Sequence, residues 1–486
     1  MKYSINAILF LSIWNFIANN FCYTAASKFS TTRFVPAPSL VRIGGLFSRL
    51  NHGQPYELGQ YSLAAFLIAL QEINNSTSIL KLTQLQYAVK ESYLSPNSAI
   101  SNSVDLITQA FSGKGVKAII GPVISTEATA SASVGASFQT VQISNSATSS
   151  ALSNDGLYPF FTRTCPSDVY QARAMASLVC EYGWRNIVTF SSSDEYGTTG
   201  MASFLESFKQ QCSPNRVLAS LTIDVNAPFI DSVTISTLVK LQARIFVFFM
   251  SASTASSVIN EGFNVGLFFE GIQIIGSDAM MGPEVYQSIP PARIPVVLKG
   301  MLGFIPTVSY SSPVAQKFLQ KIRSLPSTIF PNDCSKAVDN NGQYLYLEPT
   351  DLLLLNNTCT GLNMSVLLSD GSNLTPFAAY AYDAAYLLAR GLDYLINNGL
   401  SITGPSLYDT MVNKVSFQGA TGLVKLASSA NTDPLLGPGD RVGDVAYSLR
   451  VRLILIRILL FLLLLLPLHT HSMYIFLPYF PITYAY

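Results

Sequence analysis

The sequence predicts an α/β protein built as two similar lobes, each a parallel sheet with helices on both faces. Short apolar strands alternate with helical segments over residues 41–144 and again over residues 167–276. Within a strand expected at 244–250, residues 245–250 form an uninterrupted apolar run, which is typical of a strand covered on both faces. A chain of 486 residues also exceeds one ordinary hydrophobic core.

The first run of alternating elements begins with a strand at residues 41–50. Residues 60–74 follow as a helix that is apolar on most of its circumference, which indicates a buried helix. The remaining elements of this run are a strand at 85–89, a helix at 98–111, a strand at 117–121, a helix at 126–138 and a strand at 140–144.

Residues 143–168 join the two runs and form the stretch around which the chain is organised. A hydroxyl-rich loop at 144–153 follows an apolar strand, and an aromatic strand at 158–161 leads into a helix with Pro166 in its first turn. A loop dense in hydroxyls at the carboxyl end of a strand is where an α/β sheet places a ligand.

The second run starts with a helix at 167–182, ended by Gly183 as a C-cap. Its other elements are strands at 186–191, 216–223, 244–250 and 272–276 and helices at 198–211 and 254–263. Helices at 314–324 and 377–397, a polar insertion at 326–372 and strands at 423–426 and 444–449 follow. We therefore expect lobe 1 at 27–160, lobe 2 at 161–300, a return to lobe 1 at 301–402 and a closing segment of lobe 2 at 403–450.

Both ends of the chain differ from this pattern. Residues 1–26 have the features of a secretory signal peptide: Lys2, an apolar segment at 5–17 and small residues at 24–26. Residues 451–486 form a hydrophobic tail that is either a single membrane span or a misread end of a longer chain.

Cysteines and sequons fit an extracellular chain. Removal of the signal peptide leaves five cysteines, of which Cys334 and Cys359 are the favoured pair because they close a polar loop, and Cys180 with Cys212 is the second choice. The partners of Cys165, Cys180 and Cys212 stay open. N-glycosylation sequons occur at Asn74, Asn75, Asn356, Asn363 and Asn373.

Composition and motifs argue against several functional classes. A net charge of +1, with 12% charged residues, gives no electrostatic footprint for nucleic acid. The histidines are His52, His469 and His471, which leaves no credible Ser-His-Asp or zinc-binding set. We therefore expect a protein that is not an enzyme and has neither a cofactor nor a metal.

Several separated motifs resemble the extracellular ligand-binding domain of metabotropic glutamate receptors and other class C G-protein-coupled receptors, within the wider type I periplasmic-binding-like group. The motifs are Ser146-Ala147-Thr148, residues 158–163, Pro166-Ser167-Asp168, Gln171-Ala172, Tyr182-Gly183-Trp184, residues 196–201, residues 275–278, residues 417–422 and Gly439-Asp440-Arg441. The resemblance implies a two-lobed clamshell that closes on a ligand, a homo- or heterodimer, and an extracellular location at the plasma membrane.

Carried over motif by motif, the resemblance implies a binding site for a small zwitterion. Ser125, ahead of a helix, would bind its carboxylate together with the first amides of that helix. Ser146 and Thr148 would offer backbone and hydroxyl groups to both ends of the zwitterion. Asp168, Tyr196 and Asp278 would bind the ammonium group. The structural alternatives are an ordinary N-cap for Ser125, a solvated loop for Ser146 and Thr148, a first-turn acid for Asp168, a packed aromatic for Tyr196 and a turn residue for Asp278.

One position departs from the family pattern. Glutamate-binding members place a basic residue where this chain has Ser62, near Tyr61. A hydroxyl cannot pair with a second carboxylate, so we expect a ligand other than glutamate, a neutral or small amino acid or another small molecule. The alternatives to a G-protein-coupled receptor are a secreted binding protein without signalling and the ectodomain of a single-span guanylate cyclase resembling natriuretic-peptide receptors.

Overall fold

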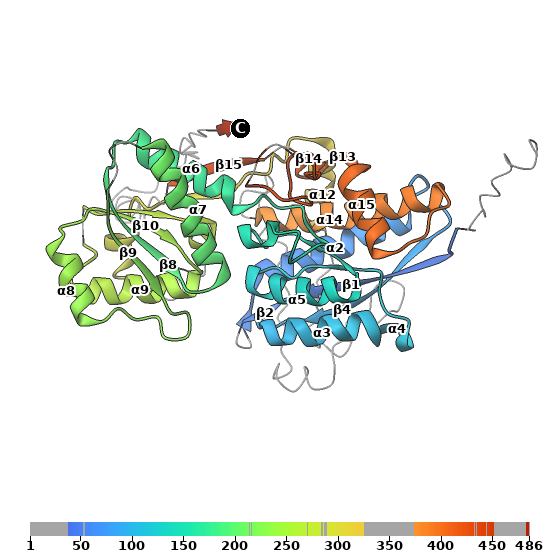
Figure 1. Cartoon of the computed structure of the whole chain (residues 1–486), viewed down its shortest axis with the longest axis horizontal. Coiled ribbons are helices and arrows are strands. Elements are labelled where there is room, and N and C mark those ends of the chain that lie inside the picture. Colours follow the sequence, from blue (N-terminus) through green and yellow to red (C-terminus); the bar gives the residue numbers. More distant parts are fainter. Residues whose placement is uncertain are drawn as a thin grey trace, which may run out of the picture.

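The chain folds into two α/β lobes that lie side by side (Figure 1). The structure, a computed structural model, describes residues 37–51, 54–324, 374–451 and 483–485, except 213, 215, 270, 283, 284, 286–288, 432, 434 and 444. The expected signal peptide, nearly all of the tail, Cys334, Cys359, Asn356, Asn363 and Asn373 lie outside these residues. No helix in the described ranges combines the length and apolarity needed to cross a membrane.

The first lobe contains a five-stranded parallel sheet in the order β4-β1-β5-β6-β7. Its strands are β1 (Leu40–Phe47), β4 (Gln84–Glu91), β5 (Ala118–Ile120), β6 (Val141–Ser144) and β7 (Phe161–Arg163). Its helices are α2 (Glu57–Asn74), α3 (Pro96–Thr108), α4 (Ala110–Gly113), α5 (Ser125–Phe138), α12 (Pro313–Arg323), α14 (Pro376–Asn397) and α15 (Gly404–Asn413). Short hairpins β2 (Leu50–Asn51) with β3 (Gln54–Pro55) and β13 (Ser416–Gly419) with β14 (Gly422–Lys425) complete it.

Alternate strand residues face two different helical layers of this lobe. Ile43 and Phe47 of β1 pack in the core formed with α2 and α14, whereas Leu46 packs against α3 on the other face. Helices α2 and α14 lie together although about 300 residues separate them in the sequence. The expected sheet with helices on both faces is therefore confirmed.

The second lobe contains a seven-stranded sheet in the order β16-β15-β12-β11-β10-β8-β9. The strands are β8 (Asn186–Ser192), β9 (Arg216–Ile223), β10 (Ile245–Phe249), β11 (Gln273–Gly276), β12 (Leu302–Pro306), β15 (Ala446–Val451) and β16 (Thr483–Ala485). The pairings β12–β15 and β15–β16 are antiparallel and the others are parallel. Its helices are α6 (Asp168–Glu181), α7 (Glu195–Gln211), α8 (Ser232–Lys240), α9 (Ala252–Asn264) and α11 (Ile294–Val297).

Some elements lie in a different lobe from the one expected. Strand β12, within the expected return to lobe 1 at 301–402, pairs in the second sheet instead. Helix α15, within the expected closing segment of lobe 2 at 403–450, packs on α14 and β6 of the first lobe. Helix α8 was not expected at all, because its Val, Ile and Thr residues obscure the helical period. The Asp231 carboxylate caps α8 by accepting from the N–H groups of Val233 and Thr234.

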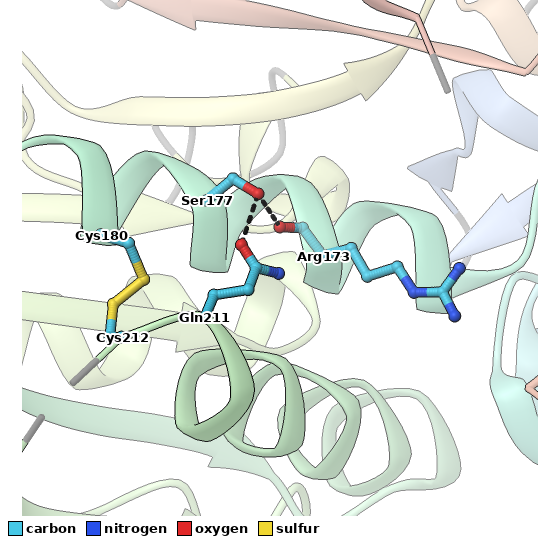
Figure 2. Close-up of a disulfide and its surroundings, with 5 residues drawn as sticks. All are labelled: Arg173, Ser177, Cys180, Gln211 and Cys212. Carbon is cyan, nitrogen blue, oxygen red and sulfur yellow. Dashed lines mark hydrogen bonds between the residues drawn. A yellow bond between two sulfur atoms is a disulfide. The ribbon is translucent and has the colours of Figure 1, made fainter.

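A disulfide between Cys180 and Cys212 joins the ends of α6 and α7 (Figure 2). This was the second choice among the expected pairs. Near it, the Ser177 hydroxyl hydrogen-bonds to the carbonyl of Arg173 and to Oε1 of Gln211. Cys165 is buried and is a free thiol.

The two described sequons differ in accessibility. The Asn74 side chain donates to the Leu85 carbonyl at 3.0 Å and accepts from the Leu85 N–H at 2.8 Å, which ties α2 to β4. A side-chain amide held in this way is a poor acceptor for a glycan. Asn75 is exposed at the end of the helix, so of these two residues the structure favours Asn75.

The chain crosses between the lobes after β7, after β12 and before β15. A buried guanidinium, that of Arg441, fixes the backbone beside these crossings: it donates to the carbonyls of Thr164 at 2.9 Å, Leu423 at 2.8 Å and Gly443 at 2.7 Å. Arg441 also donates to the Thr421 hydroxyl at 3.0 Å, so the motifs at 417–422 and 439–441 both have structural roles beside the crossings.

Candidate functional site

A cavity of about 300 Å³ lies between the lobes, at the carboxyl ends of strands from both sheets. Five of the six expected site residues line it. The first lobe contributes Ser125, Ser146 and Thr148, and the second contributes Tyr196 and Asp278. The hydroxyl-rich side of the cavity therefore faces the acidic side across the gap between the lobes.

The N-terminus of α5 forms one wall of the cavity. Its N-cap residue, Ile124, offers no side-chain hydrogen bond to the first turn, and Ser125 and Thr126 line the cavity. The first amides of a helix lack partners within the helix and carry partial positive charge. An anionic group in the cavity would therefore supply the cap that α5 lacks.

The loop that carries Ser146 and Thr148 is held rigidly from behind. Its Ser144 hydroxyl accepts from the N–H groups of Ser146 and Ala147. The fully buried Arg163 guanidinium donates to the carbonyls of Ala147 at 3.2 Å and Ser149 at 2.7 Å. These bonds fix the backbone of the loop that lines the cavity. The Ser146 hydroxyl itself donates to the Val123 carbonyl.

Arg163 also connects this loop to the chain segment that returns between the lobes. Its Nε lies 2.7 Å from Oδ1 of Asp440, and both side chains are buried. Its remaining nitrogen donates to the Ser153 hydroxyl at 2.6 Å. The Arg–Asp pair thus couples the loop to the segment that precedes β15, which the motif alone did not reveal.

Tyr196 and Asp278 form a hydrogen-bonded pair on the second lobe. The Tyr196 hydroxyl donates to Oδ1 of Asp278 at 2.5 Å, and its ring packs on Phe249 with the centroids 5.1 Å apart. Tyr196 stands in the first turn of α7, which Asp194 caps by accepting from the Gly197 N–H at 2.8 Å. Burial raises the pKa of Asp278 and raises that of Tyr196 well above its usual value.

Asp168 lies behind the cavity rather than on its surface. Its side chain is fully buried, and neither carboxyl oxygen has a hydrogen bond of good geometry among the described residues. Burial and the charge of Asp278 raise the pKa of Asp168 well above its usual value, an effect that the nearby Thr148 hydroxyl and the Arg163 charge only partly oppose. Two buried carboxyls of this kind favour a cation nearby.

The sequence pattern missed several residues that line the cavity. Tyr56, Glu57 and Leu58 come from the start of α2, and Arg450 comes from β15. Ser251 lies two residues after the end of β10, so its place at a strand's carboxyl end was a usable signal. The other positions depend on how distant segments pack and carry no local signal.

Ser62 occupies the position at which glutamate-binding members of the family carry a basic residue. It does not line the cavity. Its hydroxyl is buried, donates to the Leu58 carbonyl at 2.7 Å and accepts from Nδ2 of Asn145 at 2.9 Å. Two other residues of α2, Glu57 and Leu58, do line the cavity, and Glu57 is acidic.

Contacts also join the lobes beside the cavity. The Ser149 hydroxyl of the first lobe lies 2.9 Å from the Thr199 hydroxyl of α7. The Ser150 and Ser203 hydroxyls are 3.5 Å apart. These contacts place the loop of Ser146 and Thr148 against the helix that carries Tyr196.

Comparison with known proteins relates the chain to receptors. The model of the receptor family ligand binding region matches residues 61–435. Glutamate receptor 3.1 of Oryza sativa subsp. japonica is 24% identical over 421 residues, which is 81% of this chain and 39% of the rice protein. Metabotropic glutamate receptor 4 of Rattus norvegicus is 27% identical over 196 residues, or 35% of this chain and 22% of the rat protein.

Another plant protein, Glutamate receptor 3.7 of Arabidopsis thaliana, is 30% identical over 166 residues, which is 34% of this chain and 17% of that protein. The chain thus matches well under two thirds of the length of each of these receptors. The family model supports the two-lobed fold and covers most of the residues that line the cavity, but not Tyr56, Glu57, Leu58 and Arg450.

Proposed function

Since the chain belongs to the family of receptor ligand-binding regions, we propose that it is the extracellular part of a cell-surface receptor of the G-protein-coupled type that closes on a small amino-acid-like ligand. The observation that carries the proposal is the cavity between the lobes, with hydroxyls and a helix N-terminus on one side and Tyr196 and Asp278 on the other. These groups complement the carboxylate and ammonium of a zwitterion.

The proposed roles follow from where the groups lie. Ser125, Ser146 and Thr148 bind the ligand carboxylate together with the first amides of α5. Asp278 and Tyr196 bind the ammonium group, and the buried Asp168 adds negative potential behind them. Binding both ends of one ligand requires both lobes, so the ligand stabilises the closed arrangement over an open one.

The charges in the cavity oppose a second carboxylate on the ligand. The charged residues that line it are Glu57, Asp194, Asp278 and Arg450, so acidic groups outnumber basic ones. We propose a neutral or small amino acid rather than glutamate as the preferred ligand. A dimer at the plasma membrane is part of the same proposal.

Calorimetric titration of the protein with each common amino acid tests this function. Thr148→Ala and Asp278→Ala should each weaken binding by about 1.5–3 kcal/mol, because each removes a hydrogen bond to a charged group. Glutamate as the tightest ligand would refute the proposed specificity. Unchanged affinity in both variants would refute the proposed site.

A further inference from the structure

Directly behind the carboxylate-binding end of α5 lies a buried acid with no established role. Glu127 is in the first turn of the helix, two residues after Ser125, and its side chain is fully buried. Unlike Ser125 and Thr126, it does not line the cavity. It therefore acts on the cavity only through the helix end.

Glu127 ties that helix end to two other elements of the first lobe. The Ser48 hydroxyl, just beyond β1, lies 2.7 and 2.8 Å from the two carboxyl oxygens. The Ser95 N–H, at the N-cap of α3, donates to Oε1 at 3.1 Å. The Ser48 hydroxyl also lies 2.8 Å from the Ser92 hydroxyl and accepts from the Leu94 N–H at 3.1 Å.

This network has a consistent arrangement for both forms of the acid. When Glu127 is ionised, Ser48 donates to it and Ser92 donates to Ser48. When Glu127 is protonated, it donates to Ser48, and Ser48 donates to Ser92. Both forms keep every partner, so protonation changes the charge without breaking the network.

The charged groups nearby do not neutralise Glu127. Glu91 of β4 is engaged by Arg49, whose Nε lies 3.0 Å away. Lys90 pairs with Asp105 of α3 at 2.9 Å. Burial chiefly, and the Glu91 charge, raise the pKa of Glu127 to about 7, against the hydrogen bonds of Ser48 and Ser92.

We propose that Glu127 is a positioning residue for the carboxylate subsite, and that its protonation state makes ligand affinity depend on pH. The inference rests on the proposed function, because it needs a carboxylate at the α5 N-terminus. An ionised Glu127 competes for the partial positive charge of the helix end and repels the ligand anion. A neutral Glu127 keeps the helix end in place and leaves that charge to the ligand.

The variant Glu127→Gln tests this, because an amide can accept from Ser95 and donate to Ser48 while it carries no charge. The measured quantity is the ratio of wild-type to variant Kd for L-alanine and for acetate between pH 5.5 and 8. Ionisation of the buried Asp168 and Asp278 changes affinity with pH in the opposite direction to that of Glu127. Both proteins share these two residues, so their contribution cancels in the ratio. We expect this ratio to be near one at pH 5.5. At pH 8 the wild type should bind more weakly, with a ratio of roughly five or more, which is the lower end of typical coupling between two sites.

Asp105→Asn is the matched control, since it also replaces a carboxyl by an amide in the first lobe, and its ratio should stay flat. Carbon-13 NMR of the glutamate carboxyls supplies a second readout: acetate should raise the midpoint of the Glu127 titration, by reciprocity. A flat ratio for Glu127→Gln, with both probes binding, overturns the role of Glu127 alone. Failure of both probes to bind at any pH overturns this role and the proposed carboxylate subsite together.

Discussion

Replacing Arg163 by methionine tests whether the buried Arg163–Asp440 pair holds the site loop to the segment that precedes β15. Arg163→Met removes donors to the Ala147 and Ser149 carbonyls and to Asp440, all from a fully buried position. The Asp440 carboxylate is then left buried, with the Gly437 N–H at 3.0 Å as a remaining partner. Breaking a buried pair from one side costs about 3–5 kcal/mol, a large part of a typical folding free energy of about 5–15 kcal/mol.

Thermal unfolding by calorimetry and urea unfolding by circular dichroism measure this cost. A second variant, Arg163→Met with Asp440→Asn, removes both charges and should be more stable than Arg163→Met alone. Arg163→Lys should restore only part of the loss, because an ammonium cannot reach several carbonyls as the planar guanidinium does. A loss below about 1 kcal/mol for Arg163→Met, against the range expected for buried pairs, would refute the assigned role.

Other predictions concern the cavity and the second lobe. Tyr196→Phe should weaken ligand binding by about 1.5–3 kcal/mol, since it removes the hydroxyl that is proposed to accept a hydrogen bond from the ligand ammonium, and calorimetry that finds equal affinity would contradict this. Asp168→Asn should stabilise the unliganded protein at neutral pH. Because the folded-state pKa of Asp168 is raised, wild-type stability falls as pH rises above the unfolded value of about 4, so melting curves of the two proteins should converge below that pH. Replacing Cys180 and Cys212 by alanine should cost about 3–4 kcal/mol, from the chain entropy of the loop they close, and an unchanged melting temperature would count against a structural disulfide.

Sequence periodicity was sufficient for most of the fold because local composition decides it. An apolar run such as that of β10 indicates burial between two helical layers, and the alternation with helices indicates a parallel sheet. It was insufficient where β-branched residues form a helix, as in α8, and where an unexpected strand joins the second sheet, as β12 does. Antiparallel pairing of β15 with β12 is a tertiary choice that neither segment indicates alone.

For the candidate site, the motifs identified Ser125, Ser146, Thr148, Tyr196 and Asp278, which all line one cavity. These positions follow strand ends, where the topology of a parallel sheet already sets the location. The sequence by itself thus determined the two-lobed plan and the chemistry of the loops. Only the tertiary structure decided that Ser62 turns into the core, that Glu57 and Arg450 enter the cavity, and that Arg163 and Glu127 support it from behind. The physical reason is that these contacts join residues far apart in the chain, so their geometry depends on packing rather than on any local pattern.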